Sequence, residues 1–151
     1  MKTHYWGSFA MAVIAAGAFS AAQATPIVNG SFEEPTIMGG LTYQEYAAGD
    51  TIQPGWTVVG TAAGQGVLPT PPVAVVSSSY VDGTGTFKVP ADDGNQWLDL
   101  TGNGANSTDA GVKQTVATVP GMRYTLRFKV GNIGAGGIFG SESKVVLLIN
   151  D

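Results

Sequence analysis

Hydrophobic and polar residues alternate most regularly over residues 123–130. Four apolar side chains fall on one side of an extended segment: Tyr124, Leu126, Phe128 and Val130. Polar or basic residues fill the positions between them, and this period of two is typical of a half-buried antiparallel strand. A Pro120-Gly121 pair precedes the segment and favours a turn. The pattern therefore predicts a hairpin that joins residues 112–119 to residues 123–130.

Further short apolar runs predict strands at residues 27–28, 56–59, 73–77, 86–89, 96–100 and 144–149. Gly and Pro separate them, residues 39–49 and 131–140 are glycine-containing loops, and helical periodicity is confined to the N-terminus. We therefore expect an all-β fold, an antiparallel β-sandwich of jelly-roll type, in a single domain over residues 25–151. Asn150-Asp151 is a typical start of a turn, so we expect a further hairpin and a domain that is incomplete at its C-terminus.

Residues 1–24 have the composition of a secretory signal peptide. Lys2 lies near the start, an apolar run covers residues 9–19, and Ala22-Gln23-Ala24 fits the small-x-small rule of a signal peptidase. The run is shorter than the ~20 residues that a membrane span needs. We therefore predict cleavage after Ala24, a secreted or cell-surface protein, and no transmembrane segment in the mature chain.

The composition excludes several kinds of site. There is no cysteine, and the single histidine, His4, lies in the predicted signal peptide. A Ser-His-Asp triad, a Cys-His pair and an imidazole-ligated zinc site are therefore excluded from the mature chain. The net charge of −4 without a Lys/Arg cluster argues against nucleic acid as a partner.

Five motifs occur in an order that resembles the DUF642 / choice-of-anchor group of secreted domains. They are Asn29-Gly30-Ser31-Phe32-Glu33, Pro54-Gly55-Trp56, Asp93-Gly94-Asn95 with Leu98-Asp99-Leu100, Gln114-Thr115, and Pro120-Gly121 followed by Tyr124, Leu126 and Phe128. The resemblance implies a galactose-binding-like jelly roll, similar to carbohydrate-binding modules. It also implies that Glu33 occupies an acidic position that related jelly rolls use for structural calcium, with Glu34 and Asp151 as further candidate ligands. A solvated Glu33 carboxylate remains the alternative.

The candidate ligand-binding residues are Trp97, Asp99 and Gln114. Leu98 and Leu100 share one face of the predicted strand, so Trp97 and Asp99 share the other. An aromatic plane beside a carboxylate suits a sugar, whose C–H face stacks on the ring; packing of Trp97 under a loop is the alternative. The Gln114 amide has either a structural role or a role in ligand binding.

These observations lead to one expected function and two alternatives. We expect a secreted, non-catalytic carbohydrate-binding module whose partner is a polysaccharide or a cell-surface glycan. A structural or interaction protein of the extracellular matrix is the alternative, because fold alone does not separate the two. A glycosidase that uses two carboxylates such as Asp92 and Asp99 is the second alternative, although no acid pair lies in a recognisable catalytic setting.

Overall fold

The computed structural model describes residues 26–60, 73–82, 85, 88–101, 110–131 and 144–149. These residues form six β-strands and no helix, which confirms the predicted all-β class for the described part of the chain. The strands are β1 (Tyr43–Tyr46), β2 (Thr51–Ile52), β3 (Trp56–Val59), β4 (Val73–Ser77), β5 (Gln96–Asp99) and β6 (Gly111–Lys113).

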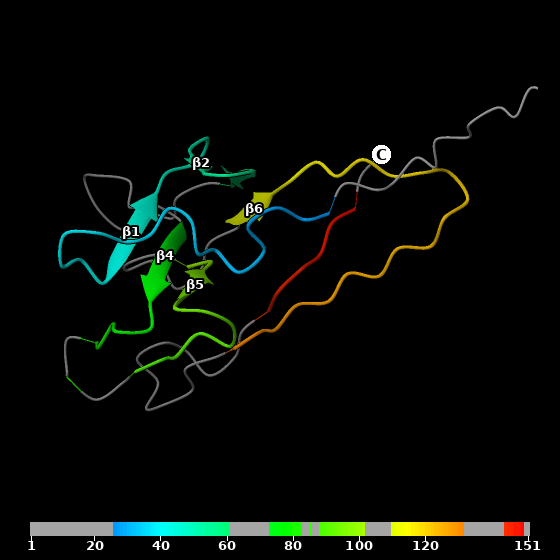
Figure 1. Ribbon diagram of the computed structural model, residues 1–151. Coiled ribbons are helices and arrows are strands. Elements are labelled where there is room, and N and C mark those ends of the chain that lie inside the picture. The colour runs from blue at the N-terminus through cyan, green and yellow to red at the C-terminus, as the bar shows by residue number, and fades with distance from the viewer. Residues whose placement is uncertain are drawn as a thin grey trace, which may run out of the picture.

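The strands form two antiparallel sheets of three strands each (Figure 1). Sheet A has the order β1-β4-β5, and sheet B has the order β2-β3-β6. The chain passes from sheet A to sheet B after β1, returns for β4 and β5, and crosses again to β6. Each sheet therefore depends on segments that are far apart in sequence.

The local sequence explains the two central strands. β4 is rich in valine, and β-branched side chains favour a strand with neighbours on both faces; its first four residues are all buried. β3 follows Pro54-Gly55, where Gly55 has φ +97°, a backbone conformation that favours glycine. This turn reverses the chain so that Ile52 of β2 pairs with Trp56 of β3.

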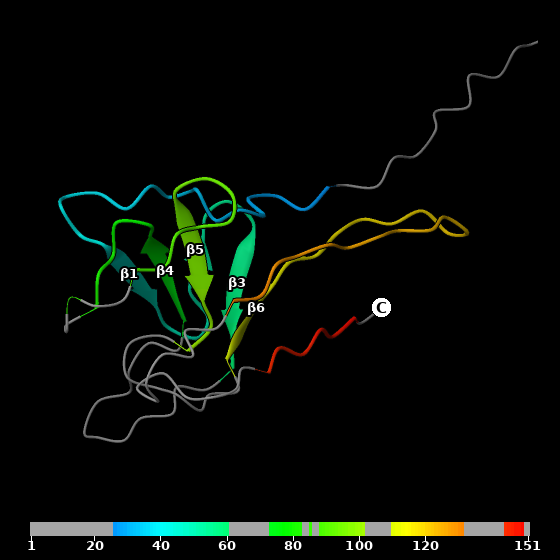
Figure 2. The same cartoon turned by 90° about the horizontal axis from the view of Figure 1, so that it is seen from below.

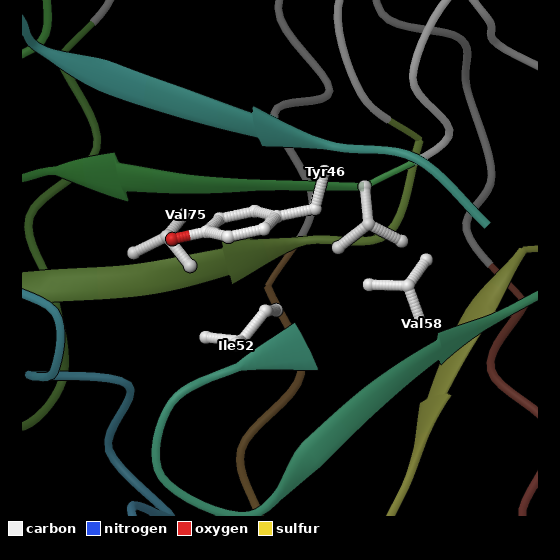
Figure 3. Close-up of a cluster of buried hydrophobic side chains, with 5 residues drawn as sticks. Tyr46, Ile52, Val58 and Val75 are labelled. Atoms are coloured by element: carbon white, nitrogen blue, oxygen red, sulfur yellow. The ribbon is translucent and has the colours of Figure 1, made fainter. Parts of the chain in front are cut away.

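One apolar cluster receives side chains from both sheets. Tyr46, Val73 and Val75 come from sheet A, and Ile52 and Val58 come from sheet B. In Figure 3, Ile52 and Val58 point from β2 and β3 toward Tyr46 and Val75. Each such buried side chain contributes about 1.5–3 kcal/mol relative to an exposed one. This cluster is the core that joins the two sheets.

The structure confirms three predicted strands and adds two. Strands β3, β4 and β5 lie within the ranges predicted from the sequence. Strands β1 and β2 were predicted as loop or not predicted, because their flanking glycines favour turns. In the structure β1 pairs with β4 over its whole length, from Tyr43 opposite Val76 to Tyr46 opposite Val73. Pairing with one edge of the valine-rich β4 thus gives β1 its strand conformation.

The predicted hairpin of residues 112–119 and 123–130 is only partly present. Its turn exists: the Met122 N–H donates to the Val119 carbonyl oxygen at 3.2 Å, and Gly121 has φ +80°. Within the predicted hairpin, however, only residues 112–113 belong to a strand, β6. Residues 123–130 pair with no described strand. Figure 2 shows this segment projecting away from both sheets. An alternating pattern supplies a buried face, but a strand also needs a partner backbone, and this pairing prediction was wrong for the described structure.

Two other predicted strands, at residues 27–28 and 144–149, are not strands in the described structure. The predicted signal peptide of residues 1–24 and the predicted loop of residues 131–140, apart from Gly131, lie outside the described residues. Within the described ranges, no helix is long and apolar enough to cross a membrane.

Candidate functional site

Residues 28–37 form no strand, yet side-chain hydrogen bonds hold them against both sheets; we call this segment the N-terminal latch. Glu33 is its first anchor. Its Oε1 accepts hydrogen bonds from the backbone N–H groups of Asn95 and Gln96, both at 2.8 Å. Gly94 lies against the same carboxylate with φ +75°, and a Cβ at this position would overlap the Glu33 side chain. Glycine is therefore required here for both space and backbone conformation.

Gln96 is the second anchor and is only 4% exposed. Its Nε2 donates to the carbonyl oxygens of Phe32 at 2.6 Å and Pro35 at 3.2 Å. Its Oε1 accepts a hydrogen bond from the Ile37 N–H at 2.8 Å. The buried amide thus has partners for both of its ends, as burial of a polar group requires.

Trp56 and Asn29 fix the start of the latch. The Trp56 Nε1 donates to the Asn29 carbonyl oxygen at 2.9 Å, and the Trp56 ring stacks on Phe32 with centroids 5.3 Å apart. The Asn29 side chain accepts from the Glu34 N–H at 3.1 Å and donates to the Gln53 carbonyl oxygen at 3.3 Å. Trp56 also packs against the core, as predicted.

Gln114 closes the latch on the side of sheet B, directly after β6. Its Oε1 accepts a hydrogen bond from the Val28 N–H at 2.7 Å, and its Nε2 donates to the Val28 carbonyl oxygen at 3.0 Å. The amide therefore pairs with one residue of backbone as a neighbouring strand would. This geometry is the structural alternative that the sequence left open for Gln114.

The latch bears on the predicted calcium site. One oxygen of the Glu33 carboxylate, Oε1, accepts two backbone N–H groups. In the ranges that the structure describes, no three His, Cys, Asp or Glu residues are grouped so that they could hold a metal ion. Asp151 lies outside those ranges. Calcium at Glu33 stays a prediction.

The other polar region is the face of sheet A that points away from the core, which we call the outer face. Leu98 packs against the core, so Trp97 and Asp99 lie on the opposite side of β5, as parity predicts. Strand register places three residues in each of two rows across the face. The first row is Tyr43, Val76 and Trp97, and the second is Glu45, Ala74 and Asp99. An aromatic row thus lies beside a row that carries two carboxylates.

The centre of the outer face is already covered, because Ala74 is 2% and Val76 is 4% exposed. The side chains of β1 and β5 around them are only half-buried. Only the side chains around the central strand β4 are therefore accessible enough to contact a ligand on this face.

We call four side chains the acid–tyrosine cluster: Tyr43 of β1, Asp99 of β5, and Tyr80 and Asp82, which follow β4. The rings of Tyr43 and Tyr80 meet edge to face with centroids 5.9 Å apart. Burial raises the pKa of the Tyr80 hydroxyl above its ordinary value of 10.0, and the neighbouring Asp82, Tyr43 and Asp99 raise it further. Asp82 is itself 7% exposed. Tyr80 therefore stays a neutral hydrogen-bond donor at physiological pH, beside two carboxyl groups.

Two side chains of β5 have defined orientations. The Oδ1 of Asp99 accepts hydrogen bonds from the Thr101 N–H at 2.8 Å and from the Thr101 hydroxyl at 2.7 Å. The Nε1 of Trp97 donates to the Val89 carbonyl oxygen at 3.1 Å. The Trp97 ring is therefore tied to the segment before β5, which agrees with the packing alternative.

Two surface hollows lie elsewhere. One, of about 610 Å³, is lined by Glu34, Pro35, Thr36, Met38 and Gln53, and the other, of about 240 Å³, by residues 113–116 and Leu148. Neither includes a residue of the acid–tyrosine cluster. The larger one is a shallow depression of the latch, and it brings no pair of titratable groups together.

Sequence reasoning found Asp99 but missed Tyr43, Tyr80 and Asp82. Tyr43 was assigned to a loop, although the alternation from Tyr43 to Tyr46 would have placed Tyr43 and Glu45 on one face. Tyr80 and Asp82 follow β4 outside any regular element, so no periodic pattern points to them. Tyr80 reaches the outer face through its ring contact with Tyr43, because β4 ends opposite Gln96 and not opposite Asp99.

Comparisons with known proteins give one match. The model of the HpiC1-like family, described as HpiC1 cyclase, matches residues 23–150, which is nearly the whole chain. Among curated proteins and solved structures, nothing matches.

The match overturns the DUF642 / choice-of-anchor assignment, and with it the carbohydrate-binding module, the matrix-protein alternative and the expectation of a non-catalytic protein. The structure explains the error. Four of the motif residues behind that resemblance hold the latch in place: Asn29, Glu33, Trp56 and Gln114. They report how the N-terminus is fastened to the sheets and carry no information about a ligand. The chain belongs to the HpiC1-like family of cyclases.

Proposed function

We propose that this protein is a cyclase-type enzyme with its active site at the acid–tyrosine cluster. Asp99 is the group that transfers a proton, and Tyr80 is a neutral hydroxyl donor of the same cluster. The observation that carries the proposal is the outer face of sheet A, where the row of Tyr43 and Trp97 lies beside the row of Glu45 and Asp99, and where the rings of Tyr43 and Tyr80 meet. The raised pKa of Tyr80, caused by burial and then by Asp82, Tyr43 and Asp99, agrees with this choice. Membership of a cyclase family supports an enzyme.

Ring closure within one molecule makes simple demands on a protein. The substrate has to be held in a folded conformation, and a proton has to be given or taken at the reacting atoms. The chain has no cysteine, and His4 is its only histidine. Proton transfer in residues 25–151 therefore falls to carboxyl, phenol and amine groups, and the cluster holds the first two of these together.

The aromatic row gives the substrate a surface to fold against. Tyr43 and Trp97 lie in that row, on either side of Val76. Ring faces bind the apolar parts of a ligand, while the few polar groups beside them fix its orientation. A substrate with an apolar body and one polar reacting centre fits this arrangement.

The surrounding fold and the location are part of the same proposal. The two sheets share one core, which supports a β-sandwich of jelly-roll type. Cleavage after Ala24 and export follow from the N-terminal sequence alone. Under this proposal the enzyme acts outside the cytoplasm as a chain that begins at Thr25.

The test is a search for turnover with the mature protein and a panel of flexible precursors that can cyclise. Closure without loss of a group leaves the mass unchanged, so product is detected as an isomer with a new retention time by liquid chromatography and mass spectrometry. Asp99→Asn should lower the rate roughly 100- to 10,000-fold. Asp93→Asn, an exposed acid outside the cluster, is the control and should leave it unchanged. Full activity of Asp99→Asn would exclude this site.

A further inference from the structure

The two oxygens of the Asp99 carboxyl group differ in their surroundings. Oδ1 accepts two hydrogen bonds from a single residue, the N–H of Thr101 at 2.8 Å and the hydroxyl of Thr101 at 2.7 Å. No described residue is seen to donate a hydrogen bond to Oδ2. The two oxygens are therefore inequivalent even though Asp99 is only half-buried.

This asymmetry decides which oxygen carries a proton. A carboxyl oxygen that accepts two hydrogen bonds has used its acceptor positions, and protonation there would displace one of the donors. Hydrogen bonds to an ionised group are also stronger than those between neutral groups. The proton of a neutral Asp99 therefore resides on Oδ2.

We propose that Thr101 is a positioning residue for the reaction, and that it presents Oδ2 of Asp99 as the single atom that exchanges a proton with the substrate. The inference rests on the proposed function, because it assigns a direction to the proton transfer proposed there. Thr101 lies two residues after Asp99, the last residue of β5, so one short segment of chain carries both the acid and the residue that positions it. The proton moves between Oδ2 and the substrate, and no further reactant is needed.

Two substitutions at Thr101 separate positioning from folding. Thr101→Val keeps the branched shape and the backbone N–H but removes the hydroxyl donor, whereas Thr101→Ser keeps both donors. Thr101 is exposed, so neither change should alter the melting temperature measurably. Thr101→Val should lower kcat roughly 10- to 100-fold with little change in KM, and Thr101→Ser should retain most of the wild-type kcat.

A measurement without substrate tests the same contact. In protein labelled with ¹³C and ¹⁵N, the Thr101 amide proton and the Asp99 carboxyl carbon should change their chemical shifts together in one pH titration. Thr101→Val with wild-type kcat, or an amide that ignores the titration of Asp99, would overturn the positioning role. If Asp99→Asn remains fully active while the two resonances still move together, the contact exists but the proposed active site fails, and the positioning role fails with it.

Discussion

The N-terminal latch and the acid–tyrosine cluster use the same kinds of side chain for opposite purposes. In the latch, the side chains of Glu33 and Gln96 form hydrogen bonds with backbone groups of the same chain. In the cluster, Asp99 has one oxygen held by Thr101, and Tyr80 lies among other titratable groups. A carboxylate or amide that bonds backbone far away in sequence, as Glu33 does, indicates architecture, whereas Asp99 bonds only Thr101, two residues further along the chain. The predictions below test this division.

Gly94→Ala should have the largest effect on stability, because there is no space for a Cβ between Gly94 and the Glu33 side chain of the latch. The new Cβ would overlap the Glu33 side chain in a backbone conformation with φ +75°. Displacing Glu33 loses two hydrogen bonds to a charged group, each about 1.5–3 kcal/mol, and the backbone conformation costs roughly 1 kcal/mol more. These contributions add to about 4–7 kcal/mol. Because Glu33 is only half-buried, we expect a smaller loss of about 3–5 kcal/mol in the free energy of unfolding, measured by urea denaturation.

Gly39→Ala is the matched control for this variant. Gly39 has φ +73°, but no atom lies within 4 Å of the position that its Cβ would occupy. It should cost only the backbone part, roughly 1 kcal/mol. Equal losses for both variants would mean that the contact between Gly94 and Glu33 contributes nothing.

Gln96→Ala should have the next largest effect. It leaves the carbonyl oxygens of Phe32 and Pro35 and the N–H of Ile37 without their partner at a position that is 4% exposed. We expect a loss of about 2–4 kcal/mol by the same denaturation assay. Gln44→Ala, at an exposed residue of β1, is the control and should change stability by less than about 0.5 kcal/mol. A similar small effect at Gln96 would contradict the role of the latch.

Tyr46→Phe should have the smallest effect and the opposite sign. The Tyr46 hydroxyl is buried, and in the described part of the chain it has no hydrogen-bond partner. Removing it should stabilise the protein by about 1 kcal/mol. Unlike the latch, the core thus carries a polar atom that its surroundings do not satisfy.

The same residue gives a dependence on pH. Burial, and then Asp50, raise the pKa of Tyr46 above the ordinary value of 10.0. The unfolded chain therefore loses this proton first as the pH rises, so the titration of Tyr46 leaves the folding stability unchanged below about pH 10 and lowers it above that pH. Thermal melts between pH 8 and 11 should show a smaller alkaline loss for Tyr46→Phe than for wild type. An identical alkaline loss would exclude Tyr46 as its source.

Local patterns predicted the strands β3, β4 and β5, which are rich in apolar residues, and they failed where a partner strand decides the outcome. β4 was found because its valines favour a strand by themselves, whereas β1 takes its conformation from its pairing with β4. Residues 123–130 alternate more regularly than any other segment, yet no described strand pairs with them. Regular alternation is thus no substitute for a partner edge.

The candidate site was predictable only in part for the same reason. The parity of β5 placed Trp97 and Asp99 on one face, and the structure confirms that placement. Tyr43 joins the outer face through the pairing of β1 with β4, and Tyr80 joins it through its ring contact with Tyr43; no local motif encodes either contact. The motifs that did attract attention belong mainly to the latch, and this is why they suggested a different family.

The division between latch and cluster is tested most directly by measuring kcat and melting temperature for two variants in parallel. Gln114→Ala removes the pair of hydrogen bonds to Val28 and should lower stability by about 1–2 kcal/mol, with kcat within about twofold of wild type at a temperature where it is folded. Tyr80→Phe should lower kcat by about tenfold or more and leave the melting temperature nearly unchanged. A Tyr80→Phe variant with wild-type kcat, or a folded Gln114→Ala variant that has lost turnover, would contradict the account.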